Sequence, residues 1–221
     1  MKKMFLVVLA FAFVACDKTE KTPLGDSDLS IMKEKNSSDL SLVGKNGKKV
    51  TPNDVYSEIR YIAEDGVVFC KNKSTGQESL YDKWGNTIFR NAQTVTKEVS
   101  VWKANYKDGT TQIWDKKHNL KTDIYNNIIV GLNQIIVSKD GKCGVLNRKG
   151  ETILPLEFKE IKVIDDGKDY CYIIFDEKAK LWRRYDNTGK KTKTVYSVRT
   201  LEKMQKRAVS SWSGGFKVKK I

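Results

Sequence analysis

The sequence predicts an all-β protein made of about five degenerate β-hairpin, or β-meander, repeats. Two observations carry this prediction. A short turn pattern returns along the chain at intervals of 32 to 39 residues, and apolar runs rich in Val, Ile, Tyr, Phe and Trp lie on both sides of the copies. A period of this size is typical of repeat arrays, in which each unit buries its apolar face against its neighbours.

The clearest copy lies in the segment 142–161, KCGVLNRKGETILPLEFKEI. An apolar run ends at Leu146, a turn covers Asn147 to Gly150, and a second apolar run follows before Pro155. Asn at the first turn position can accept a hydrogen bond from its own backbone two residues on, and Gly at the fourth position accepts a positive φ. The segment is therefore predicted to be a β-hairpin.

Four weaker copies of this turn complete the set. They are Val43-Gly44-Lys45-Asn46-Gly47, Tyr81-Asp82-Lys83-Trp84-Gly85, Trp114-Asp115-Lys116-Lys117-His118 and Tyr185-Asp186-Asn187-Thr188-Gly189. The first lacks the acid, and the third ends in His118 where the others have Gly. Because His is one of the few residues besides Gly that are enriched at positive φ, we expect His118 to take that position.

Four of the five turns are followed by an aromatic and a β-branched residue close together, as in Tyr125 and Ile128, while the second is followed only by Val95. An apolar run precedes each later turn. This pattern predicts about three strands in each period. Five such units can close into a propeller-like ring or form an open, twisted β array. Three strands are fewer than the four of a typical propeller blade, so both arrangements stay open at this point.

The repeat resembles the WG (KWG) repeat. That pattern is Lys-Trp-Gly, two apolar residues, Asp or Asn, two residues, Gly-Lys, a β-branched pair, Pro, then an aromatic residue, an acid and Ile or Ala. Residues 142–161 match it nearly throughout, although Cys143 stands where the family has Trp. In the last unit Trp182 fills that position, whereas the pair Trp84-Gly85 sits in a turn, out of register. The resemblance covers about residues 40–200 and implies a domain, 41–200, that is a non-catalytic interaction module, often secreted or attached to the bacterial envelope.

The N-terminus predicts export and a lipid anchor. Lys2 and Lys3 precede a short apolar stretch that ends at Ala15, which describes a secretory signal of residues 1–15 rather than a bilayer span. Cys16 directly after the small residue resembles a bacterial lipobox, which implies lipidation (palmitate) of Cys16, a membrane attachment and a location in the bacterial envelope. The alternative is an ordinary signal peptide with an incidental cysteine. Residues 16–40 are polar and poor in aromatics, so they are predicted to be a flexible tether.

The C-terminal segment 201–221 differs from the repeats. Leu201, Met204 and Ala208 have the spacing of a short amphipathic helix, and an alternating segment ends the chain. Two alternatives follow. The end of the chain is either a strand that pairs with the first unit and closes a ring, or a frayed tail after a helix that caps the array.

The chain is strongly basic, with a formal net charge of +14. Such a charge favours acidic partners. Because the chain is expected to be exported and basic residues occur in every repeat, we expect an envelope protein or an anionic glycan as the partner, the membrane through the lipid on Cys16, and no nucleic acid. The alternative is that the lysines only solubilise the units and protect exposed strand edges.

The sequence contains no recognisable catalytic motif, so we predict no enzyme, no cofactor and no metal site. The single histidine, His118, lies at a predicted turn. Cys70, Cys143 and Cys171 fit no metal-binding spacing and are predicted to be buried free thiols, with one oxidised pair as the alternative.

The aromatic residues that recur beside the turns are the candidate binding surface. They are Tyr81, Trp114, Trp182 and Tyr185. Most such residues form the core between repeats, but a subset on one face could form a binding platform. The predicted function is a non-catalytic binding module of the envelope. The alternatives are a structural or spacing protein and an enzyme with an unrecognised site.

Overall fold

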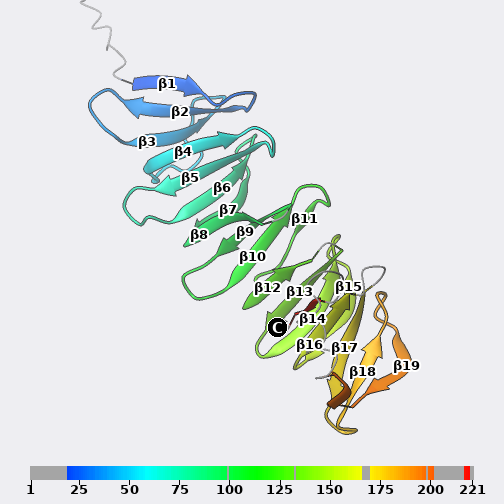
Figure 1. Cartoon of the computed structure of the whole chain (residues 1–221). Coiled ribbons are helices and arrows are strands. Elements are labelled where there is room, and N and C mark those ends of the chain that lie inside the picture. The colour runs from blue at the N-terminus through cyan, green and yellow to red at the C-terminus, as the bar shows by residue number, and fades with distance from the viewer. Residues whose placement is uncertain are drawn as a thin grey trace, which may run out of the picture. The chain divides into compact units, whose positions relative to one another are not determined.

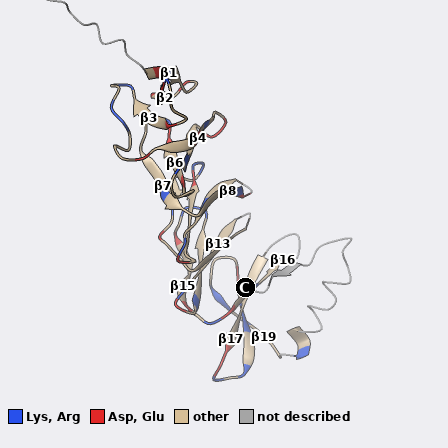
Figure 2. Cartoon of the chain, turned by 90° about the vertical axis from the view of Figure 1, so that its left-hand side faces the viewer, with Lys and Arg blue, Asp and Glu red and all other residues tan. Residues whose placement is uncertain are grey.

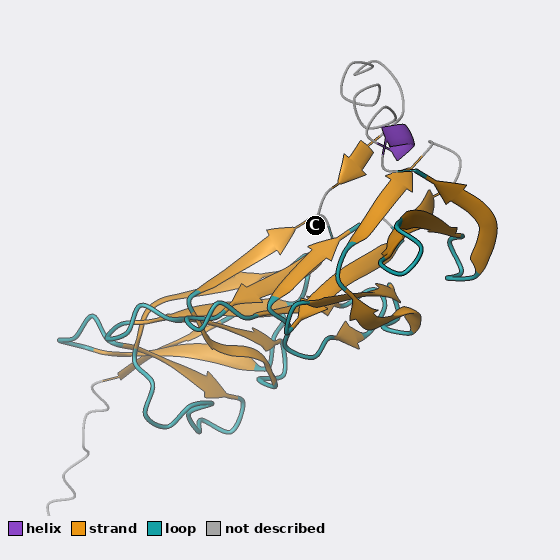
Figure 3. Ribbon diagram, turned by 90° about the horizontal axis from the view of Figure 1, so that it is seen from below, coloured by secondary structure: helices purple, strands orange, loops and turns teal. Residues whose placement is uncertain are grey.

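The computed structural model describes residues 19–98, 100–131, 133–165, 170–197, 199–201 and 217–219. These residues form twenty strands and one helical turn at 199–201, and the strands lie in four sheets (Figure 1). Strands and loops make up almost all of this part of the chain (Figure 3). The prediction of an all-β protein is confirmed. In the described residues, no helix has the length and apolar character needed to cross a membrane.

The chain divides into two compact units, residues 1–76 with 81–86 and residues 77–80 with 87–221. In the first sheet the strand order is β1-β2-β3-β4-β5-β6-β7. Its strands are β1 Thr19–Pro23, β2 Leu29–Glu34, β3 Leu40–Gly44, β4 Tyr56–Ile62, β5 Val67–Asn72, β6 Glu78–Asp82 and β7 Thr87–Ala92. The core of the first unit consists of Leu24, Leu29, Leu42, Tyr56, Ile59, Val68, Cys70 and Tyr81.

The predicted tether over residues 16–40 is wrong from Thr19 onward. This segment forms β1, which pairs with β2 from Thr19 opposite Glu34 to Pro23 opposite Ser30. Leu24 and Leu29 are 8% and 1% exposed and belong to the core of the first unit. The polar composition was misleading because β1 is an edge strand whose five side chains are all exposed. The repeat domain therefore begins about twenty residues earlier than predicted.

Three antiparallel sheets follow in the second unit, with the orders β11-β10-β9-β8, β12-β13-β14-β15 and β19-β18-β17-β16-β20. The strands of the first two are β8 Thr94–Glu98, β9 Val101–Asn105, β10 Thr111–Asp115, β11 Leu120–Lys121, β12 Asn127–Val130, β13 Gln134–Lys139, β14 Lys142–Asn147 and β15 Thr152–Phe158. The strands of the last are β16 Ile161–Asp165, β17 Tyr170–Asp176, β18 Leu181–Tyr185, β19 Lys191–Tyr196 and β20 Lys217–Lys219.

Apolar cores join consecutive sheets of the second unit. Ile113 and Leu120 from one sheet pack with Ile128 and Ile135 from the next. Farther along, Val145 and Leu154 pack with Ile161 and Tyr172, among others. Burial between neighbouring repeats, as the periodicity predicts, is confirmed in this unit.

Each later period holds four strands rather than about three. The sets β4 to β7, β8 to β11, β12 to β15 and β16 to β19 each run antiparallel along the chain. The additional strand is the one that carries the aromatic and β-branched landmark: Ile128, for example, lies in β12 and pairs with Val137.

The predicted turns form as expected at four of the five positions. Asn147 Oδ1 accepts hydrogen bonds from the backbone N of Lys149 at 2.8 Å and of Glu151 at 3.0 Å, and Gly150 has φ +86°. Gly47, Gly85 and Gly189 also have positive φ. The prediction for His118 is wrong, because the residue with positive φ is Asn119, at 50°. This turn is one residue longer than the turn at Asn147, and the ring of His118 contacts Asp115.

Turn glycines also allow neighbouring repeats to approach closely. A Cβ on Gly150 would lie 2.7 Å from Leu120 Cδ1, and a Cβ on Gly189 would clash with the backbone O of Ile153. In both cases the contacted residue follows the turn of the preceding repeat. Glycine at this position therefore meets two requirements, a positive φ and the absence of a side chain.

Cys143 and Gly144 lie side by side in β14 of the clearest repeat. A Cβ on Gly144 would lie 3.0 Å from the backbone of Leu154 and Leu156 in β15, so a side chain there would press on the neighbouring strand. The pairing of β14 with β15 shifts register at this point. Cys143 is 7% exposed and lies in the core.

The C-terminal segment covers an edge of its own sheet. Leu201 is 1% exposed and packs with Trp182 and Ile164, so the apolar face of the predicted helix begins as expected. Met204 and Ala208 lie outside the described residues. β20 pairs antiparallel with β16, with Val218 opposite Ile164. The described strand Lys217–Lys219 pairs within its own sheet and not with the first unit, so the predicted ring-closing pairing is wrong for these residues.

Candidate functional site

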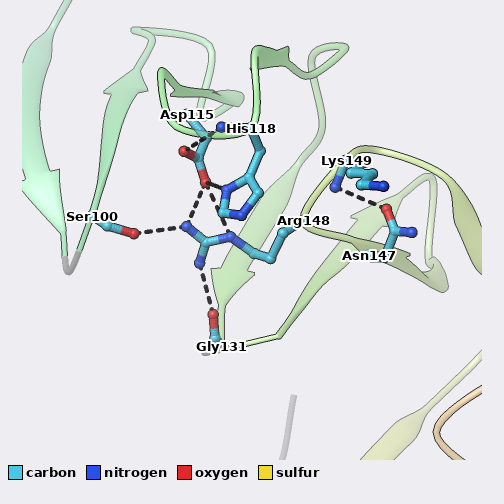
Figure 4. A network of polar contacts seen from close by, with 7 residues as sticks. All are labelled: Ser100, Asp115, His118, Gly131, Asn147, Arg148 and Lys149. Carbon is cyan, nitrogen blue, oxygen red and sulfur yellow. Dashed lines mark hydrogen bonds and ion pairs between the residues drawn. The ribbon is translucent and has the colours of Figure 1, made fainter.

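A network of polar contacts in the second unit is built on Asp115 and Arg148 (Figure 4). Asp115 ends β10, and Arg148 lies in the turn between β14 and β15. Asp115 Oδ2 accepts hydrogen bonds from Arg148 Nε at 3.1 Å, from Arg148 Nη2 at 2.5 Å and from His118 Nδ1 at 2.9 Å. One carboxylate oxygen thus binds side chains from two repeats.

The guanidinium of Arg148 also binds two further loops. Nη1 donates to the backbone O of Gly131 at 2.9 Å, and Nη2 donates to Ser100 Oγ at 2.8 Å. Gly131 follows β12 and Ser100 precedes β9. The planar guanidinium, with donors in fixed directions, suits this role better than a lysine ammonium would. Arg148 therefore ties the turn of one repeat to three places in its surroundings (Figure 4).

Both charged side chains are buried. Asp115 is 0% exposed and the Arg148 side chain 8%, whereas the His118 side chain is 27% exposed. Burial by itself raises the pKa of Asp115, but the hydrogen bonds from His118 and Arg148 outweigh it and hold the pKa of this carboxyl below its ordinary value of 3.8. Asp115 is consequently a carboxylate at neutral pH, and its charge is compensated by Arg148.

The pair of Asp115 and His118 has the contact of a carboxylate that orients a catalytic imidazole. A nucleophile would have to lie next to the other ring nitrogen of His118. The hydroxyl of Ser100, however, binds Arg148 instead. The arrangement is that of a clamp between repeats. Sequence reasoning missed it, because Asp115 was already explained as a turn acid and Arg148 lies 33 residues away at a variable turn position.

The predicted aromatic platform is wrong for two of its four members. Tyr81 is 0% exposed, and its hydroxyl is 3.2 Å from that of Tyr56 in the core of the first unit. Trp182 is 6% exposed and packs against Phe175, with 5.2 Å between ring centroids. Trp114 and Tyr185 are partly buried. Tyr81 and Trp182 belong to apolar cores, and Tyr185 packs against one.

Trp84, which the repeat pattern excluded because it lies in a turn, is a strongly exposed aromatic residue. It is 63% exposed, more than the other exposed large hydrophobic residues of the described chain, Ile124 at 45% and Val195 at 44%. Lys83 Nζ lies 5.2 Å from the centroid of its ring. The position of Trp84 between Lys83 and Gly85 at the tip of a turn could have indicated its exposure, since a side chain there has no neighbouring strand to cover it.

The three cysteines of the described residues lie in the cores, as predicted. Cys70 is 0%, Cys143 7% and Cys171 6% exposed, and all three are free thiols. Burial raises the pKa of the Cys70 and Cys143 thiols, which keeps them protonated and unreactive. The predicted lipidation site, Cys16, lies outside the described residues. Within those residues, no group of three or more His, Cys, Asp or Glu side chains is placed to hold a metal ion.

No protein-family model matches the sequence, and no curated protein matches it. Among solved structures, the chain is similar to BamB from Moraxella catarrhalis, with 14% identity and a TM-score of 0.30 over 80% of this chain and 60% of that one. It is similar to Hsv2 from Kluyvelomyces marxianus, with 10% identity and a TM-score of 0.30 over 78% and 62% of the two chains. The WD40 β-propeller domain of Doa1 gives 13% identity and a TM-score of 0.26 over 77% and 65%. The chain thus spans about 60% of the length of the first of these proteins.

Proposed function

We propose that the protein is a membrane-anchored lipoprotein of the bacterial envelope whose β-repeat domain binds another protein without catalysing a reaction. The observation that supports binding is Trp84, a tryptophan 63% exposed at the tip of the β6–β7 turn. Tryptophan is strongly enriched among the residues that dominate protein interfaces. Its large rigid ring gives contact area at a small cost in conformational entropy.

The turn that carries Trp84 is held in one conformation. Asp82 Oδ1 accepts hydrogen bonds from the backbone N of Trp84 at 2.9 Å and of Asn86 at 2.8 Å. The backbone O of Lys83 accepts one from Asp28 N at 2.9 Å. Gly85, at φ +93°, packs against Leu29 and Val50 of the first unit. A partner would therefore meet a presented tryptophan without the cost of ordering its loop.

We also infer that the units are repeats of the WG type. Support comes from Gly144, whose missing side chain lets β14 lie against the backbone of β15, and from the buried position of Cys143 where the family has Trp.

Changing Trp84 to Ala is expected to weaken capture of an envelope protein about thirtyfold, the effect of removing an interface anchor worth about 2 kcal/mol. Saturation binding of the captured partner to wild type and variant measures this. The matched control is Ile124→Ala, which removes another exposed apolar side chain, 45% exposed, from a loop. Equal affinity of wild type and W84A would remove Trp84 as the anchor, and the absence of any saturable protein partner would favour a spacing role.

The lipid anchor has a separate test. Replacing Cys16 with Ser is expected to move the protein from the membrane fraction to the soluble fraction, because the serine oxygen cannot receive the thioether-linked lipid. Membrane flotation and the intact mass of the wild-type protein are the measurements. An unlipidated wild-type protein that still floats with membranes would contradict the anchor.

A further inference from the structure

The positive charge of the protein is unevenly divided between its two units. Residues 19–76 with 81–86, the described part of the first unit, contain ten basic and ten acidic side chains, so that part is neutral. Basic residues occur in every repeat, but acids balance them only in the first unit. The excess is strongest in residues 178–199, which contain eight basic residues and one acid, Asp186.

Six exposed cations of this segment form what we call the basic edge. They are Lys178, Lys180, Lys190, Lys191, Lys193 and Arg199. They lie on β19, the outermost strand of the last sheet, on the turns at the two ends of β18, and just after β19 (Figure 2). Trp182 between them is buried, so this edge presents charge without a large exposed ring.

Nearby carboxylates are already engaged. Asp186 Oδ1 accepts hydrogen bonds from the backbone N of Thr188 at 3.0 Å and of Lys190 at 2.9 Å, and from Thr188 Oγ1 at 2.6 Å. Glu177 pairs with Lys159 at 2.6 Å. Asp176 pairs with Arg183, which is not part of the basic edge. Among the described residues, the acids of this region therefore leave most of its positive charge uncompensated.

Protection of a sheet edge explains only part of this pattern. Lysines on an edge strand, such as Lys191 and Lys193, discourage pairing with another chain. That role does not require Lys178, Lys180 and Lys190 in the turns, nor Arg199 beyond the strand. Lysine ammonium groups on flexible stems give little directional selectivity, and they suit a surface of many phosphates better than a single fixed anion.

We propose that the basic edge binds the phosphate headgroups of an anionic lipid bilayer. This contact would be a second, electrostatic attachment besides the lipid on Cys16, and in that respect it rests on the proposed function. A lipid anchor and a polybasic surface commonly act together in membrane attachment. The basic edge by itself is expected to bind anionic membranes in a salt-dependent way.

The test uses the chain from residue 16 to 221 with Cys16→Ser, so that no lipid contributes, and therefore it can succeed or fail independently of lipidation. Phosphatidylcholine vesicles with about 30% phosphatidylglycerol are expected to sediment the protein, while pure phosphatidylcholine vesicles leave it in solution. Binding should decrease as the salt concentration rises. Changing both Lys191 and Lys193 to Gln should weaken binding about thirtyfold, from about fivefold for each cation.

The matched control changes Lys33 and Lys35 to Gln. Both lysines are exposed and lie in the neutral first unit. Their replacement lowers the net charge by the same amount as the replacement of Lys191 and Lys193. The proposal requires this control to bind like the parent. Equal weakening by the two double variants would show an effect of net charge alone and overturn the proposal. Binding to polyphosphate without binding to anionic vesicles would also overturn it and indicate a soluble polyanion instead.

Discussion

Replacing Arg148 with Met is expected to lower the free energy of unfolding by about 3–5 kcal/mol, the cost of leaving a buried carboxylate without its counter-charge. Asp115 is 0% exposed, so water cannot replace the guanidinium. The change also frees the backbone O of Gly131 and the hydroxyl of Ser100, which lose their donors. Urea unfolding, followed by tryptophan fluorescence, measures the loss.

The double variant Asp115→Asn with Arg148→Met separates the charge effect from lost packing. It removes the buried charge as well as its partner, so it is expected to be more stable than R148M alone by about 1–2 kcal/mol. Strict additivity of the two changes would contradict a charge pair. The single variant Asp115→Asn should also reduce the acid sensitivity of the protein. Because the folded pKa of Asp115 lies below 3.8, its stabilisation is present above that pH and is lost as the pH falls through the folded pKa.

Replacing Gly189 with Ala is expected to cost more than the same change at Gly109, although the two residues have nearly the same φ, +83° and +82°. At Gly109 a Cβ meets nothing within 4 Å, so only the backbone conformation is penalised, by about 1–2 kcal/mol. At Gly189 the Cβ would clash with the backbone O of Ile153, which cannot rotate away. We expect a further loss of about 1–3 kcal/mol as β15 and the turn move apart.

Chemical unfolding of both variants gives the comparison, because the φ penalty cancels between them. If Gly189→Ala and Gly109→Ala were equally destabilised, the close approach to Ile153 would have no energetic weight. A third variant, Gly150→Ala, should lie between them, since its Cβ would meet Leu120 Cδ1, the end of a flexible side chain, at 2.7 Å.

Local patterns predicted the hairpins and much of the core. The turn at Asn147 and Gly150 forms as expected because its hydrogen bonds involve residues close in sequence. The burial of Cys70 and Cys171 followed from their apolar neighbours. These features are determined by a few consecutive residues, so a single sequence suffices to find them.

Features that depend on distant residues or on weak composition were missed. Leu24 and Leu29 are too few among polar neighbours to indicate strands, yet they complete a core formed by residues far along the chain. The ion pair of Asp115 and Arg148 joins two turns whose residues each have a sufficient local explanation. At His118, the positive φ moved by one position to Asn119, because a longer turn lets the imidazole reach Asp115.

The start of β1 at Thr19 limits how far the protein can extend from a membrane-bound Cys16. Only Asp17 and Lys18 lie between the two positions, and the three peptide links from Cys16 to Thr19 span at most about 10 Å. A lipid on Cys16 would therefore hold the first sheet close to the headgroups, with almost no freedom to swing outward. Partners of Trp84 would have to come to the bilayer surface or belong to the same membrane.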